Sequence, residues 1–114
     1  MPTYSKGDVV IVLYPYSDGS GTVSRPAVVV SSNAVNHHSR DVILAQVTSR
    51  IDPPLRIGEH VLTDLQSAHL NVPSKVKTGR LISIETSLVR RRIGRLSTGD
   101  LAATEQNLRI VFGL

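Results

Sequence analysis

Three short apolar runs, rich in β-branched residues, constrain this chain most strongly. They span Val9–Tyr14, Pro26–Ser31 and Asp41–Thr48. Runs this short and this rich in Val and Ile are typical of buried strands rather than helices. A polar turn at Ser32–Arg40 joins the second and third runs, which predicts an antiparallel meander. The segment Pro15–Ser24, with its glycines, serines and proline, is expected to form a long loop.

Shorter strands are predicted in the second half of the chain. His60–Asp64 forms one, and Pro73–Lys77 and Arg80–Glu85 form two more around a turn at Thr78 and Gly79. The segment Gln66–Leu70 is expected to be a turn or a single helical turn. These strands add to the first three and make the fold mainly β.

A helix is predicted at the end of the sequence. Ser97 is expected to cap its N-terminus, and Asp100, three residues on, to complete a capping box. Gly113 ends the helix. Four apolar residues fall near one face of this helix: Leu101, Leu108, Val111 and Phe112.

These elements predict one domain over residues 1–114, a small and strongly bent antiparallel β-sheet or barrel with a C-terminal helix. Small sheets expose an edge, and pairing with a second copy covers it, so a homodimer is expected.

Composition excludes several classes of function. The 114 residues include no cysteine, which excludes a disulfide scaffold, a thiolate zinc site and a cysteine nucleophile. No apolar stretch reaches the roughly 20 residues of a membrane span, and the N-terminus lacks the order of a signal peptide, so a cytoplasmic protein is expected. His37 and His38 have no carboxylate at ligand spacing, and no metal site or cofactor is predicted.

The charge balance suggests a polyanionic partner. Lys and Arg number 13 against 9 acidic residues, a net charge of +4. Most of the cations are Arg, whose planar fork matches phosphate. A dense basic cluster at Arg90–Arg92 and Arg95 fits either a phosphate contact or a solvated turn before the helix. On charge alone, nucleic-acid binding and a merely soluble basic surface are equally supported.

Arg25 and Thr48 form the one candidate site that follows from the strand arrangement. Arg25 lies where the long loop meets the second strand, and Thr48 ends the third strand. If the two strands form a meander, both side chains lie at one mouth of the sheet. An arginine and a hydroxyl there make a candidate anion site.

The order of several short motifs resembles the MazF/PemK toxins of bacterial type II toxin–antitoxin systems. These motifs are Gly7–Val10, Arg25–Ser31, Val47–Ser49, Leu70–Lys77 and Arg92–Ser97, followed by the amphipathic helix. The resemblance implies an SH3-like β-barrel that works as a homodimer in the bacterial cytoplasm. It also implies sequence-specific, metal-independent cleavage of single-stranded RNA. In that reaction the 2′-hydroxyl attacks the adjacent phosphate and leaves a 2′,3′-cyclic phosphate and a 5′-hydroxyl.

The same resemblance assigns residues to this chemistry. The family's arginine before proline falls on Arg25, which would stabilise the phosphate, and its strand-end threonine falls on Thr48, which would hydrogen-bond it. Two departures stand out: Lys77 and Gly79 replace an Arg and an Asp of some members. The general base stays open, because arginine is a poor proton acceptor. Four residues are expected to contact RNA: Asp18, which could instead act as the base, Ser49, Lys77 and Arg80.

The resemblance implies an acidic cognate antitoxin as the protein partner, which suits the net charge of +4. Two other functions remain open. One is a non-catalytic toxin of the same barrel class that binds a protein such as gyrase through its C-terminal helix. The other is an inactive barrel that acts only as a binding module.

Overall fold

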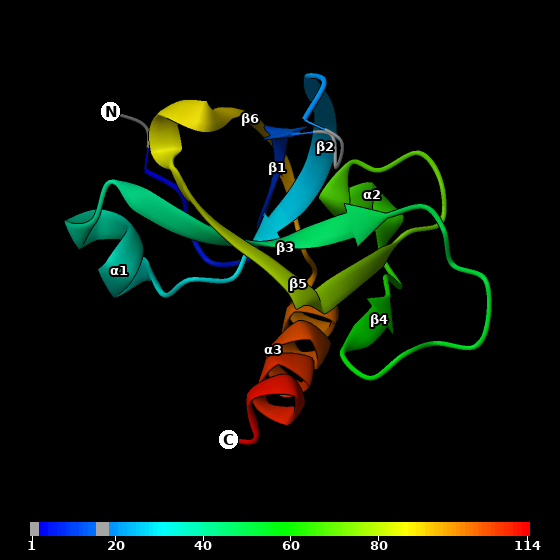
Figure 1. The fold of residues 1–114 in the computed structure, drawn as a ribbon. Coiled ribbons are helices and arrows are strands. Elements are labelled where there is room, and N and C mark those ends of the chain that lie inside the picture. Colours follow the sequence, from blue (N-terminus) through cyan, green and yellow to red (C-terminus); the bar gives the residue numbers. More distant parts are fainter. Residues whose placement is uncertain (1–2, 16–18) are drawn as a thin grey trace.

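The central feature of the fold is one strongly bent antiparallel sheet. The computed structural model describes residues 3–15 and 19–114. The strands follow the order β4-β5-β3-β2-β1-β6, and all neighbours are antiparallel (Figure 1). Their bounds are β1 Asp8–Pro15, β2 Thr22–Val29, β3 Asp41–Thr48, β4 Glu59–Val61, β5 Lys75–Glu85 and β6 Val89–Arg95. The helices are α1 Asn33–His38, α2 Leu65–Ala68, the 3-10 turn η1 Thr86–Leu88, and α3 Thr98–Phe112.

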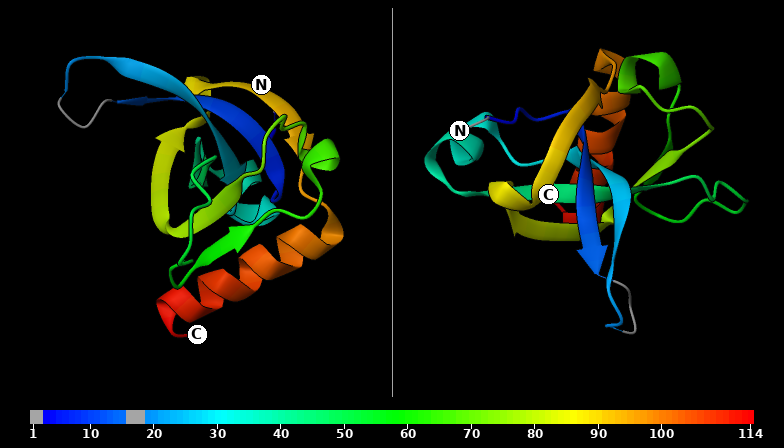
Figure 2. Two further views of the ribbon diagram at one scale, coloured as in Figure 1. Left: turned by 90° about the vertical axis from the view of Figure 1, so that its right-hand side faces the viewer. Right: turned by 90° about the horizontal axis from the view of Figure 1, so that it is seen from above.

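Both faces of the central strands are buried. Successive side chains of a strand point to opposite faces, so Val9 and Val10 enter different cores. The sheet curls around the first core, which includes Val10, Ala27 and Leu44. The second core lies on the other face, where α2 and α3 cover it, as the two views of Figure 2 show. Strands that are covered on both faces have nearly continuous apolar sequences, because every side chain is packed against one core or the other.

The predicted meander and bent sheet with a C-terminal helix are confirmed. Strand β3 has the predicted bounds, and β2 pairs with it antiparallel. Two local predictions were wrong. Strand β2 begins at Thr22, inside the expected loop, because Thr22–Ser24 pair with the end of β1. The turn Ser32–Arg40 contains α1, whose N-terminus is capped when the Ser32 side chain accepts from the Val35 amide.

Strand β5 is continuous, so the predicted turn at Thr78 and Gly79 was wrong. The register shifts there, because Gln46 is opposite Lys77 while Ala45 is opposite Leu81, which marks a bulge. Thr78 is fully buried, and its amide and hydroxyl both donate to the Gly58 carbonyl, at 2.9 and 2.7 Å. The bulge therefore attaches the loop before β4 to the middle of β5.

The C-terminal helix begins as predicted but without a capping box. Ser97 Oγ accepts from the Asp100 amide at 3.1 Å. The Asp100 carboxylate does not reach back to Ser97; it is buried and accepts from the Thr63 and Asp64 amides instead. The expected apolar face is only partly covered, since Phe112 is 60 % exposed. In the described part of the chain, no helix is long and apolar enough to cross a membrane.

Candidate functional site

Arg25 and Thr48 lie on the same face of the sheet: Thr48 ends β3, whereas Arg25 lies in the middle of β2. Ala27 of β2 is opposite Gln46 of β3, and residues directly opposite in a sheet share a face. Arg25 lies two residues before Ala27, and Thr48 two residues after Gln46. Since the strands are antiparallel and side chains alternate, both residues occupy the face of the first core. That the two form one site stays a prediction.

This face changes from apolar to polar where the strands leave the core. Leu44 is buried in the first core, and the next two β3 residues on that face are Gln46 and Thr48. On β5, Lys77 lies opposite Gln46 and Lys75 opposite Thr48. Polar and cationic side chains therefore continue the rows that the core residues begin.

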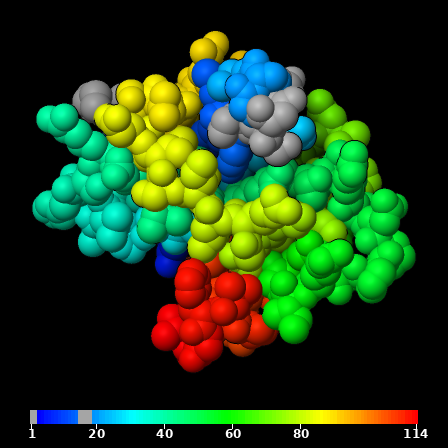
Figure 3. Space-filling view, in the orientation of Figure 1, coloured from blue at the N-terminus to red at the C-terminus, as the bar shows by residue number. Residues whose placement is uncertain are grey.

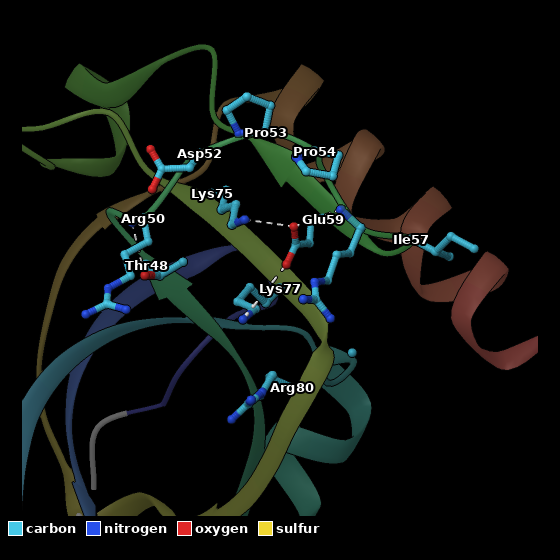
Figure 4. A pocket seen from close by; sticks show the side chains of 12 residues that line it. Thr48, Arg50, Asp52, Pro53, Pro54, Ile57, Glu59, Lys75, Lys77 and Arg80 are labelled. Carbon is cyan, nitrogen blue, oxygen red and sulfur yellow. Dashed lines mark hydrogen bonds and ion pairs between the residues drawn. The ribbon is translucent and has the colours of Figure 1, made fainter.

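A cavity of about 530 Å³ lies beside Thr48, and we call it the loop cavity. The segment between β3 and β4 forms one wall and β5 the other (Figure 4). Its lining includes five cationic side chains against two carboxylates, so it favours an anionic ligand. The lining residues are Thr48, Arg50, Asp52, Pro53, Pro54, Arg56, Ile57, Glu59, Lys75, Lys77, Gly79 and Arg80.

Glu59 holds two of these cations. Its carboxylate lies between Lys75, at 2.8 Å, and Lys77, at 3.9 Å (Figure 4). It also accepts from the Arg56 amide at 3.0 Å. The hydrogen bond from that amide and the one from Lys75 lower the pKa of Glu59, although burial raises it. The side chain of Glu59 is 5 % exposed and that of Lys77 is 26 % exposed, so Lys77 stays available to a ligand.

Thr48 is placed to donate a hydrogen bond. Its Oγ1 accepts from the Arg50 amide at 3.2 Å. A hydroxyl that accepts from the backbone keeps its proton for another acceptor. The side chain is half-buried beside the loop cavity, so a phosphate oxygen there could accept that proton.

A second cavity, of about 280 Å³, adjoins the first, and we call it the strand cavity. Arg80 lines both cavities, whereas Arg25 lines only this one. Arg25 is exposed at the rim. The remaining lining residues are Tyr14, Gln46, Leu81 and Ile82.

The predicted site residues separate into three groups. Arg25, Thr48, Lys77 and Arg80 line one or both of these adjoining cavities. Ser49 is exposed and lines neither, since the strand alternation turns it from Thr48's face. Asp18 lies outside the described residues.

The site residues that were not predicted include Tyr14, Gln46, Glu59 and Lys75. A signal for two of them is present in the sequence. Gln46 interrupts an apolar strand, and Lys75 directly precedes buried Val76. Polar residues at the end of an otherwise buried strand indicate where the strand leaves the core. Glu59 gave no such signal, because its role depends on a pairing between β4 and β5 that is distant in sequence.

The basic cluster Arg90–Arg92 and Arg95 lies on strand β6, not in a turn as one interpretation had it. Two of its members face the fully buried carboxylate of Asp8, at 3.9 Å for Arg92 and 3.5 Å for Arg95. These arginines therefore neutralise a buried charge. A phosphate contact at Arg90 and Arg91 stays a prediction.

Within residues 3–15 and 19–114, no group of three or more His, Asp or Glu side chains is placed to hold a metal ion. The face of the molecule seen in Figure 3 includes β5, the segment before β4 and the end of α3. The last two are in contact, since a Cβ on Gly58 would lie 2.7 Å from a Val111 methyl.

Comparison with solved structures supports the fold. The chain is 23 % identical to MazF in a MazE–MazF crystal structure from Deinococcus radiodurans, with 99 % of each chain covered and a TM-score of 0.78. It is 21 % identical to the Mycobacterium tuberculosis toxin MazF-mt6, covering 92 % of this chain and 97 % of that one, with a TM-score of 0.71. A mycobacterial endoribonuclease solved with its cognate antitoxin gives 17 % identity, coverage of 97 % and 96 %, and a TM-score of 0.77.

No protein of curated function matches the sequence. One family model matches residues 5–112, nearly the whole chain, and describes the PemK-like, MazF-like toxin of type II toxin–antitoxin systems. The match includes every strand of the sheet and the C-terminal helix. This chain therefore belongs to the PemK-like, MazF-like family of type II toxins.

Proposed function

We propose that this toxin is a sequence-specific endoribonuclease that cleaves single-stranded RNA without a metal ion. The observation that carries the proposal is the position of Arg25 and Thr48 on one face: Thr48 lines the loop cavity with its five cationic side chains, and Arg25 lines the adjoining strand cavity. Each RNA phosphate is an anion, and this surface offers it charge and a hydroxyl donor. Two of the similar structures are endoribonucleases from mycobacteria.

The proposed reaction is an internal displacement at phosphorus. The RNA 2′-hydroxyl loses its proton as its oxygen forms a bond to the adjacent phosphorus, the bond to the 5′-oxygen of the next nucleotide breaks, and that oxygen takes up a proton. The products are a 2′,3′-cyclic phosphate and a 5′-hydroxyl. Charge accumulates on the equatorial oxygens, where Arg25, Lys77 and Arg80 would stabilise it and Thr48 would donate a hydrogen bond.

In this proposal Glu59 positions two lysine side chains and takes no part in proton transfer. Its pKa is lowered by the hydrogen bonds that it accepts, which makes its carboxylate a weak proton acceptor. The same contacts hold Lys75 and Lys77 beside Thr48.

The direct test incubates purified protein with a long single-stranded RNA. We expect cuts at a short recurring sequence, with cyclic phosphate and 5′-hydroxyl ends. A matched RNA with a 2′-deoxy sugar on the 5′ side of the cut should bind and stay intact, because the nucleophile is absent. Cleavage of the deoxy RNA would indicate a water nucleophile and contradict the mechanism.

Two variants test the residues. Arg25→Ala should lower the cleavage rate by about 10²–10³, the usual loss when one charged donor to a transition state is removed. Thr48→Ala should also slow cleavage. Arg40→Ala removes an exposed arginine outside both cavities and serves as the control. Wild-type rates in a folded Arg25→Ala protein would place the chemistry elsewhere.

We further propose an acidic antitoxin segment and a second copy of the chain as partners. Similar toxins have been solved as MazE–MazF complexes. An acidic segment would suit the cations of the loop cavity, so antitoxin and RNA should compete. An unchanged RNA affinity at saturating antitoxin would contradict a shared surface, and light scattering would test the homodimer.

A protein target such as gyrase is the alternative. The end of α3 exposes Ile110, Phe112 and Leu114, and an apolar helix end of this kind suits a protein contact. Gyrase inhibition by a protein that leaves RNA intact would favour it.

A further inference from the structure

The strand cavity has the size and lining of a site for one planar group. Its volume of about 280 Å³ is below the roughly 300–1,000 Å³ of sites for drug-sized ligands. Leu81, Ile82 and the Tyr14 ring give it an apolar lining, and Gln46 and two arginines give it polar groups. Apolar surface combined with a few polar groups is how proteins bind an unstacked nucleobase.

One of its polar groups is buried without a partner among the described residues: the Tyr14 hydroxyl makes no hydrogen bond there. Gln46 is half-buried in the same lining, where its amide can reach a ligand. A buried polar group without a partner is costly, so a ligand that supplies one gains affinity. Burial raises the pKa of Tyr14 to about 12, so its hydroxyl keeps its proton as a donor.

The position of Gln46 connects this cavity to the proposed reaction. Gln46 lies on the same face as Arg25 and Thr48, two residues before Thr48 and opposite Lys77. Arg80 lines both this cavity and the loop cavity. A phosphate held by Arg25 and Thr48 would therefore place a neighbouring base at the strand cavity.

We propose that the strand cavity binds the nucleobase adjoining the scissile phosphate, and that the Gln46 amide selects this base. The proposal rests on the proposed ribonuclease function and adds a specificity-determining residue to it. The amide presents an N–H donor beside a carbonyl acceptor in one plane, which matches the paired groups on a base edge. In DNA readout the glutamine amide pairs with adenine, so we expect adenine at this position.

The test cleaves a randomised single-stranded RNA pool and sequences the cut ends. Wild type should favour adenine next to the cut by at least about fivefold, the discrimination expected of one bidentate pair. Gln46→Leu, which is similar in size but apolar, should lose that preference and raise the KM for the favoured RNA. Gln46→Glu, which removes the amide donor, should change the preferred base. Gln106→Leu, an exposed position on α3, is the matched control and should retain the wild-type profile.

The outcomes separate the two proposals. If wild type cuts RNA and folded Gln46→Leu and Gln46→Glu keep its base preference, the assignment of Gln46 is wrong while the ribonuclease proposal stands. If wild type cuts no RNA, both proposals fail. Should both Gln46 variants fail to fold, Tyr14→Phe provides the same test, because it removes only the unpartnered hydroxyl. An unchanged profile and KM in that variant would overturn the cavity's role.

Discussion

Asp100→Asn should destabilise the protein, because Asp100 connects α3 to the segment after β4. Both carboxylate oxygens accept from the Thr63 amide, at 3.0 and 3.1 Å, and Oδ2 also accepts from the Asp64 amide at 3.0 Å. Oδ1 accepts from the Thr63 hydroxyl and lies 2.8 Å from His60 Nε2. Asparagine preserves the shape but removes the charge and directs an amide donor at these donors.

The size of the loss follows from the ionisation of Asp100. Burial raises its pKa, but hydrogen bonds from His60, Thr63 and Asp64 outweigh this effect and hold the pKa at about 2 against an ordinary value of 3.8. A difference of nearly two units corresponds to about 2–3 kcal/mol at neutral pH. Since the folded pKa is below the unfolded one, this stability is present above pH 3.8 and is lost as the pH falls toward 2.

Urea unfolding across pH 2–7 measures this effect. At pH 7, Asp100→Asn should lower the free energy of unfolding by about 2–3 kcal/mol. The gap between the two proteins should narrow between pH 4 and 2, as the wild-type carboxylate becomes protonated. Asp41→Asn, at an exposed position, is the control and should stay within about 0.5 kcal/mol of wild type. A gap below about 0.5 kcal/mol at pH 7, or one that does not change with pH, would refute the reasoning.

Three further predictions concern the site and its support. Glu59→Gln should lower the free energy of unfolding in urea by about 3 kcal/mol, because it leaves the buried Lys75 ammonium without its anion; a loss below about 1 kcal/mol would contradict this. Gly94→Ala should lower the free energy of unfolding by about 1–3 kcal/mol, because the added Cβ would lie 2.6 Å from the backbone of α2. Gly99→Ala is the control and should not destabilise the protein, because its added Cβ meets nothing within 4 Å. Equal melting temperatures of the two variants would count against this prediction. RNA cleavage should persist in excess EDTA, because side-chain cations supply the positive charge that stabilises the reacting phosphate. Loss of cleavage on chelation, restored by a divalent ion, would refute this prediction.

The strands that are buried on both faces could be predicted from the sequence. The runs in β1, β2 and β3 are continuous and apolar, and this pattern locates them within a few residues. The elements that depend on distant contacts could not. The bulge in β5 follows from the bond between Thr78 and Gly58, and α1 follows from a cap at Ser32 within a polar segment.

The residues of the candidate site also divide into those that a local sequence pattern predicts and those that depend on distant contacts. Arg25 and Thr48 were predicted at one mouth of the sheet because a meander aligns the two strands; the structure places them on one face, in the linings of two cavities that share Arg80. The contact between Glu59 and Lys75 could not be predicted, since no local pattern indicates that β4 pairs with β5. Asp100 was assigned to a local capping box because the sequence does not show the competing amides of the segment after β4.

The covering of both sheet faces has a consequence for how proteins of this fold can diverge. A substitution at a buried position of β1, β2 or β3 disturbs one core or the other, because the packed stretch of each strand is covered on both faces. Substitutions outside this stretch avoid this cost, since Arg25 is exposed and Thr48 is half-buried where they continue a core face beyond the packed residues. Gln46 lies at the same boundary, half-buried at the edge of the core. Under the proposed function, substitutions at these few boundary positions are expected to change the ligand preference at a lower cost in folding stability than substitutions in either core.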